Sequence, residues 1–147
     1  MLILKPGGDI FKSPAQTLVV PVNTHGVMGN GLALAFSNRF PGLLIDYRRA
    51  CALGKILKEG FHVWDSETGK KILCFPTKRK WQFDSRLDWI DLSLEKIALN
   101  YKDHGITSLA VPALGCGKGN LKWEDVYPMI KQYLGHLDID VYVYPPY

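Results

Sequence analysis

Short runs of apolar and β-branched residues recur along the whole chain and predict buried β-strands. Such uninterrupted runs are typical of strands that are covered on both faces of a sheet. A polar turn over residues 65–70 separates two of the runs and predicts a hairpin. The strands are expected at residues 2–4, 17–22, 61–64, 71–75, 108–112 and 139–144.

Segments with helical periodicity lie between these strands. The clearest has one apolar stripe formed by Leu87, Ile90, Leu94, Ile97 and Tyr101. Three more helices are expected: one that begins near Leu32 and stops before Pro41, one at 43–53 and one at 123–134. A basic loop is expected from Pro76 to Ser85. The alternation predicts a single domain over residues 1–147, a three-layer α/β/α fold with a mixed, largely parallel sheet.

Two glycine-rich loops each follow an apolar strand and precede a helix, at residues 23–31 and 114–120. Glycine lets backbone N–H groups approach an anion closely, and a helix N-terminus adds favourable partial charge. In open α/β sheets, ligands bind beyond the carboxyl ends of the strands, so both loops are expected to line one crevice. A single glycine-rich turn is more often only a turn, but the pair suggests a diphosphate ligand. Neither loop matches the phosphate-binding loop of nucleotide triphosphatases, because no Gly-Lys-Ser/Thr follows.

Composition narrows the picture further. The chain has 147 residues with a formal net charge of +4, which does not by itself indicate a nucleic-acid binder. Its three cysteines and four histidines are scattered, so neither a disulfide framework nor a metal site is expected. Apolar runs fall well short of the roughly 20 residues that span a bilayer. Residues 1–5 lack the organisation of a signal peptide. A cytoplasmic protein without membrane contact is therefore expected.

The ordered motifs resemble those of the macrodomain family across essentially the whole chain. They are Gly8-Asp9-Ile10-Phe11, Val22-Asn23-Thr24 with Gly29-Asn30-Gly31, and Val111 to Gly117. The resemblance implies an ADP-ribose ligand, with the Asp9 carboxylate accepting from the adenine amino group and the two loops holding the ribose and the diphosphate. No cofactor is implied. The ligand-binding residues are then expected to be Asp9, Ile10, Asn23, Thr24, Val27, Met28, Gly29, Gly31, Leu114, Gly115, Cys116, Gly117, Gly119 and Tyr144.

Within the family, the segments 23–31, 75–81 and 121–124 resemble the DarG branch. Members of that branch are antitoxins that remove ADP-ribose from thymidine bases of single-stranded DNA and oppose a DarT-like toxin. A branch that acts on glutamate-linked ADP-ribose carries an aspartate where this chain has Gly119. The resemblance therefore implies a DNA-directed hydrolase. Two alternatives stay open: a reader that binds ADP-ribose without catalysis, and a hydrolase of O-acetyl-ADP-ribose, ADP-ribose-1''-phosphate or ADP-ribosylated protein.

Lys78 and Asn23 are the candidate catalytic residues. Without the resemblance, a lysine in a charged loop is usually solvated, and an asparagine after a strand often caps a turn. The resemblance makes Lys78 the catalytic lysine of a Thr-Lys step. It could stabilise charge on the departing base, donate a proton, or attack the anomeric carbon as an amine. The Asn23 amide can both donate to and accept from ribose hydroxyls.

Lys80, Trp81 and Arg86 are the candidate DNA contacts. Cations neutralise phosphates, and an indole offers a face on which a base can stack. A place for Trp81 in the core is an equally good interpretation. Cys116, between two glycines, is more readily explained as a small residue in a tight turn than as a nucleophile, because no histidine lies nearby in the sequence.

Overall fold

The computed structural model describes residues 1–80 and 82–146, which form one sheet covered by helices on both faces. The strand order is β1-β6-β5-β2-β4-β3. All neighbouring strands run parallel except β3, which pairs with β4 in the opposite direction. The strands are β1 (Leu2–Leu4), β2 (Thr17–Asn23), β3 (His62–Asp65), β4 (Lys71–Lys78), β5 (Ser108–Val111) and β6 (Asp140–Val143).

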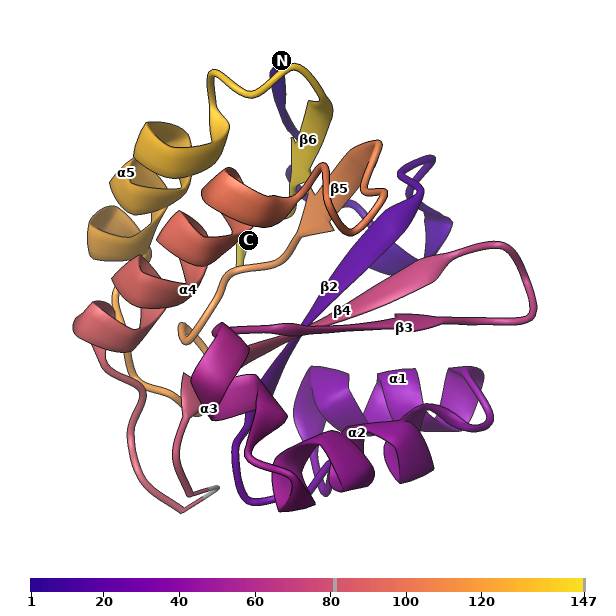
Figure 1. Ribbon diagram of the computed structural model, residues 1–147. Coiled ribbons are helices and arrows are strands. Elements are labelled where there is room, and N and C mark those ends of the chain that lie inside the picture. The colour runs from indigo at the N-terminus through magenta and orange to yellow at the C-terminus, as the bar shows by residue number, and fades with distance from the viewer. Residues whose placement is uncertain (81, 147) are drawn as a thin grey trace.

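The helices form two layers, as Figure 1 shows. One layer holds α4 (Leu87–Asn100) and α5 (Trp123–Leu134), and the other holds α1 (Gly31–Arg39), α2 (Leu43–Ala52) and the short α3 (Lys55–Glu59). A 3-10 turn, η1 (Ile10–Lys12), follows β1. The three-layer α/β/α fold with a mixed, largely parallel sheet is therefore confirmed. No helix of residues 1–80 and 82–146 is long and apolar enough to span a membrane.

Successive residues of the central strands face opposite layers because side chains alternate along a strand. In β2, Val19 packs in the core beneath α4 and α5, whereas Leu18 and Val20 pack beneath α1 and α2. In β4, Leu73 and Cys74 divide between the two cores in the same way. Burial on both faces explains why these strands appear in the sequence as uninterrupted apolar runs.

The predicted loop from Pro76 to Ser85 is wrong at its first three residues. Pro76, Thr77 and Lys78 continue β4. Pro76 pairs with Val22 and Lys78 with Asn23 of β2, and the register irregularity between these pairs skips Thr77. Pairing of β4 with β3 ends at Cys74. At Pro76, β4 therefore pairs with β2 on one side and, within the described residues, with no strand on the other. A proline is tolerated at such an edge, because no ladder hydrogen bond from its nitrogen is needed there.

Candidate functional site

A cavity of about 680 Å³ opens at the carboxyl ends of β2, β4 and β5. Both glycine-rich loops line it, as expected from the topology. Its wall also includes the last residues of β4 and the segment that follows β6. The lining residues are Gly8, Ile10, Pro21–Asn23, Val27, Gly29–Ala33, Thr77, Lys78, Ser85, Pro112, Ala113, Gly115, Gly117–Gly119 and Tyr144–Pro146.

The first loop is organised by the side chain of Asn23, the last residue of β2. Its Oδ1 accepts from the backbone N–H groups of His25, Gly26 and Val27 at 2.9, 3.0 and 3.3 Å, and its Nδ2 donates to the carbonyl of Val27 at 2.8 Å. The Tyr47 hydroxyl lies 2.6 Å from the Asn23 carbonyl oxygen and 2.9 Å from Oδ1. Burial raises the pKa of Tyr47 far above its usual range, so this hydroxyl stays a donor. The amide therefore serves first to shape the loop.

The N-terminus of α1 faces the cavity. Residues 30–33 line the cavity. In the first turn of α1, the backbone N–H of Leu34 donates to the Asn30 carbonyl. The N–H groups of the first turn have no acceptor within the helix, and the helix dipole adds positive potential there. Gly31 has φ +58°, a conformation that a glycine adopts without strain. This end of the cavity is therefore suited to a phosphate oxygen.

The second loop depends on close packing between backbone and neighbouring side chains. Gly115 has φ +72°, and a Cβ on it would lie 2.7 Å from Leu121 Cδ1. A Cβ on Gly119 would collide with Ser85 Oγ and lie 2.5 Å from the Gly115 carbonyl oxygen. Gly117 has no neighbour within 4 Å of its Cβ position, so it borders open space. The structure thus explains why position 119 carries no acid: no side chain fits there in this conformation.

Lys78 connects the two loops. Its carbonyl accepts from Thr24 N at 3.1 Å, at the start of the first loop. Its Nζ donates to the Lys118 carbonyl of the second loop at 3.3 Å. Lys78 also pairs in register with Asn23, which places both candidate catalytic residues at adjacent strand ends. A cationic donor is therefore held at the cavity wall between the two loops.

Most of the predicted ligand residues line the cavity, but five do not. Met28 and Leu114 are buried in the core. Asp9 is exposed and accepts from Phe11 N at 3.0 Å, so that it caps η1. Thr24 donates its hydroxyl to the Arg79 carbonyl at 3.0 Å, away from the cavity. Neither Asp9, Thr24 nor Cys116 appears in the cavity wall.

The Cys116 thiol is half-buried, and its Sγ lies 3.5 Å from the Leu114 carbonyl oxygen. Burial, with a smaller contribution from the Glu124 carboxylate, raises the pKa of this thiol to about 11. A nucleophilic cysteine needs the opposite shift, since the thiolate is the reactive form. The geometry therefore agrees with a structural role for Cys116 in the turn.

Several cavity residues were missed from the sequence, among them Thr77, Ser85 and Lys118. Ser85 is buried, and its hydroxyl has no hydrogen-bond partner among the residues that the structure describes. Its backbone N–H donates to the Gly119 carbonyl at 3.0 Å, which ties the β4–α4 loop to the second glycine loop. No local pattern marks such a residue. Thr77 could have been found, because it belongs to the Thr-Lys step that identified Lys78.

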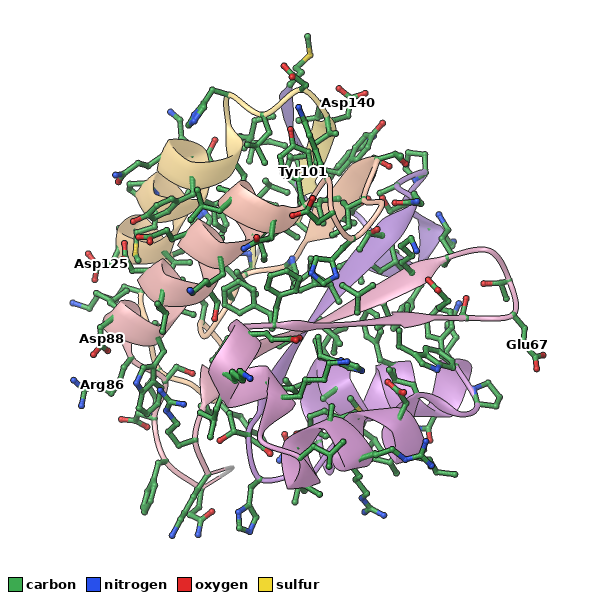
Figure 2. The ribbon with its side chains drawn as sticks, in the orientation of Figure 1. Glu67, Arg86, Asp88, Tyr101, Asp125 and Asp140 are labelled. Carbon is green, nitrogen blue, oxygen red and sulfur yellow. The ribbon has the colours of Figure 1, made fainter. Side chains whose placement is uncertain are left out.

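The candidate DNA contacts have different surroundings. Lys80 is exposed, whereas Arg86 forms an ion pair with Asp88 through Nε–Oδ1 at 3.0 Å and Nη2–Oδ2 at 3.1 Å. Figure 2 shows this pair on the outside of the molecule at the start of α4. Trp81 lies outside the described residues. Among the residues the structure does describe, no group of three His, Cys, Asp or Glu side chains is arranged to hold a metal ion.

Comparison with known proteins places the chain in a family. The family model described as "Macro domain" matches residues 19–130. A DNA ADP-ribosyl transferase–DNA ADP-ribosyl glycohydrolase fusion protein of Thermosipho africanus is 40% identical over 95% of this chain, which spans 40% of that relative's length. The solved macrodomain of Mycobacterium tuberculosis DarG superposes with a TM-score of 0.93 at 36% identity, over 100% of this chain and 99% of that one. Thermosipho africanus DarTG in complex with ADP-ribose superposes with a TM-score of 0.90 at 41% identity, over 98% of this chain and 42% of that one. The chain belongs to the macrodomain family.

Proposed function

We propose that this protein is a hydrolase that removes ADP-ribose from thymidine bases of single-stranded DNA. The observation that carries the proposal is Lys78, held between the two glycine loops at the wall of the cavity. Two relatives support it: the name of one includes DNA ADP-ribosyl glycohydrolase, and the structure of another was solved in complex with ADP-ribose. A DarT-like toxin as cognate partner and a location in the cytoplasm belong to the same proposal.

The cavity accounts for ligand binding in two halves. The diphosphate lies between the N-terminus of α1 and the second loop, where Gly117 leaves open space and the backbone can approach an anion. The adenine lies against Ile10 and Tyr144, which border the cavity beside Gly8. The Asp9 carboxylate, although engaged with Phe11 N through Oδ1, keeps a second oxygen for the adenine amino group.

The chemistry is assigned to Lys78. In hydrolysis of the N-glycosidic bond, water adds its hydroxyl to the anomeric carbon and the base leaves with a proton. Lys78 Nζ acts as a hydrogen-bond donor in the structure, and in the proposed reaction it stabilises charge on the departing base and donates the proton. Asn23 holds the first loop in the shape that positions the distal ribose.

The second loop argues against a glutamate-directed covalent mechanism. That mechanism, as the resemblance implies it, uses an acid in the second loop. Gly119 supplies none, and a side chain there would collide with Ser85. Of the catalytic lysine and the second-loop acid, this chain therefore has only the lysine.

The test is an oligonucleotide that carries ADP-ribose on one thymidine, followed on a denaturing gel. We expect the wild-type protein to restore the unmodified mobility and release ADP-ribose, and Lys78→Ala to do so at least about 100-fold more slowly. O-acetyl-ADP-ribose and glutamate-linked protein serve as competing substrates. Turnover of these two without turnover of the DNA would show a different macrodomain hydrolase, and ADP-ribose binding without any turnover would show a reader.

A further inference from the structure

A group of cations and aromatic rings lies on the loop from β4 to α4 and on the first turn of α4. We call it the cation–aromatic rim; it consists of Arg79, Lys80, Phe83, Arg86 and Trp89. Both ends of this loop contribute to the cavity wall, through Lys78 at one end and Ser85 at the other. The rim therefore lies next to the place where the bond to the base would be cleaved.

Phe83 is the exposed aromatic of the rim. Its side chain is 57% exposed, and among the exposed large apolar residues of the described ranges it is the aromatic one. Lys80 Nζ lies 6.0 Å from the ring centroid. Phenyl faces bind unstacked nucleobases regardless of sequence, and a cation beside the ring can contact the phosphate of the same nucleotide. Phe83 and Lys80 together thus provide the two contacts that one nucleotide of a single strand requires.

The second part of the rim is a stack on Trp89. The guanidinium of Arg79 lies 4.8 Å from the Trp89 ring centroid and that of Arg86 lies 5.4 Å from it. Arg86 is also held by Asp88, and this hydrogen bond lowers the pKa of the Asp88 carboxyl. These contacts fix the geometry before a ligand arrives, which reduces the entropy lost on binding.

The charge of the rim is suited to phosphates. Arg86 is neutralised by Asp88, whereas neither Arg79 nor Lys80 forms an ion pair with any residue in the described ranges 1–80 and 82–146. Cation–aromatic pairs elsewhere, such as Lys102 with Tyr101 in the turn after α4 and Lys131 with Tyr127 on α5, are single pairs outside the cavity wall.

We propose that the cation–aromatic rim binds the nucleotides that flank the modified one, with Phe83 stacking on a neighbouring base and Arg79 and Lys80 contacting backbone phosphates. The proposal rests on the proposed DNA substrate, and it adds the path of the strand. The occupant is a single strand, because bases in a duplex are stacked on each other and present no free face to Phe83.

The experiment measures binding of an unmodified, fluorescently labelled single-stranded oligothymidylate by anisotropy. Phe83→Ala is expected to weaken binding about tenfold, as one lost base–aromatic stack does. Lys80→Ala is expected to weaken binding and to reduce the slope of log K against log salt by about 0.7, the value for one lost phosphate contact on a single strand. Lys131→Ala and Leu99→Ala are the matched controls, an exposed cation beside an aromatic ring and an exposed apolar residue, both outside the cavity wall, and both should bind like wild type.

The kinetic counterpart separates this inference from the proposed function. Phe83→Ala should raise KM for the ADP-ribosylated oligonucleotide about tenfold and leave turnover of an ADP-ribosylated single nucleoside unchanged, because the nucleoside has no flanking base. Affinity for free ADP-ribose should also be unchanged, since Phe83 lies outside the cavity wall.

Wild-type binding of oligothymidylate by Phe83→Ala, or equal binding of single strand and duplex by the wild-type protein, would overturn the inference. So would an equal loss of Phe83→Ala activity on the nucleoside and on the oligonucleotide. If the rim binds single strands through Phe83 but thymidine-linked ADP-ribose is not released, the proposed function is wrong and the inference that the rim binds single strands is upheld. If Phe83→Ala releases ADP-ribose with an unchanged KM, the inference about the rim is wrong and the proposed function is upheld.

Discussion

The two glycine-rich loops both line one cavity, but they are held in shape by different means. In the first loop, one polar side chain holds the backbone in place: the Asn23 amide makes hydrogen bonds to three backbone N–H groups and one carbonyl. In the second loop, backbone hydrogen bonds such as Leu121 N to Gly115 O and Ser85 N to Gly119 O are combined with close packing against glycines. The first loop depends on a side chain that is present, and the second on side chains that are absent.

This difference predicts how each loop can be damaged. Removing the amide from position 23 leaves backbone donors of the first loop without an acceptor. In the second loop, adding atoms is the damaging change, except at Gly117, where the space toward the cavity is open. Lys78 contacts both loops and so provides the substitution that separates chemistry from loop structure.

The largest effect is expected from Lys78→Ala. The Nζ contact to the second loop is lost, whereas the Thr24 contact is kept because it uses the backbone carbonyl of Lys78. Turnover of ADP-ribosylated DNA should fall roughly 100- to 1000-fold, the usual effect of removing a group that stabilises transition-state charge. Affinity for free ADP-ribose should change by less than about tenfold, which corresponds to about 1.4 kcal/mol. Single-turnover kinetics and calorimetry measure the two quantities; full activity in Lys78→Ala would remove this residue from the mechanism.

The next largest effect is expected from Gly117→Glu in the second loop. The added carboxylate enters open space, so the fold should be retained, but it would face the proposed position of the diphosphate. Like-charge contact of this kind costs several kcal/mol, so calorimetric ADP-ribose affinity should fall more than roughly 100-fold. Gly117→Ala is the control and should bind nearly as wild type. Tight binding by Gly117→Glu would show that the diphosphate lies elsewhere.

A smaller effect is expected from a pair of substitutions in the first loop. Asn23→Ala should lower the free energy of unfolding by about 1–3 kcal/mol, because buried backbone donors lose their acceptor. It should also reduce ADP-ribose affinity about tenfold, through the altered loop, and lower turnover with it. Tyr47→Phe removes one hydroxyl from the same network and should cost only about 1 kcal/mol of stability. Denaturant unfolding and calorimetry distinguish the two; equal effects of both variants would contradict the central role given to the amide.

The smallest effect is expected from Cys116→Ser. Burial raises the pKa of the thiol to about 11, so we expect the thiol to be protonated at neutral pH and to take no part in the proposed reaction. Turnover should therefore stay within about twofold of wild type. Alkylation of Cys116 by iodoacetamide, followed by mass spectrometry, should be slow at pH 8 and accelerate as the pH approaches 11. Rapid alkylation at pH 7 would indicate an activated thiol instead.

The fold was predictable from the sequence because its signals are local. Apolar runs and the stripe through Ile90 and Leu94 depend only on the spacing of neighbouring residues, and the structure has strands and helices at those places. The short helix α3 was missed, because its five residues give too few turns for a periodic signal. The end of β4 was missed because Pro76 is normally a loop residue, and its tolerance there depends on where β3 stops.

The sequence by itself determined the order of the elements, the two glycine loops beyond parallel strands, and the family motifs that single out Lys78. Tertiary structure alone decided which atoms of those motifs face the cavity. It turned Thr24 toward Arg79, buried Met28 and Leu114, and placed Ser85 beneath Gly119. The physical reason is that a strand or helix is encoded by residues a few positions apart, whereas a cavity wall forms where strand pairing and core packing bring distant residues together.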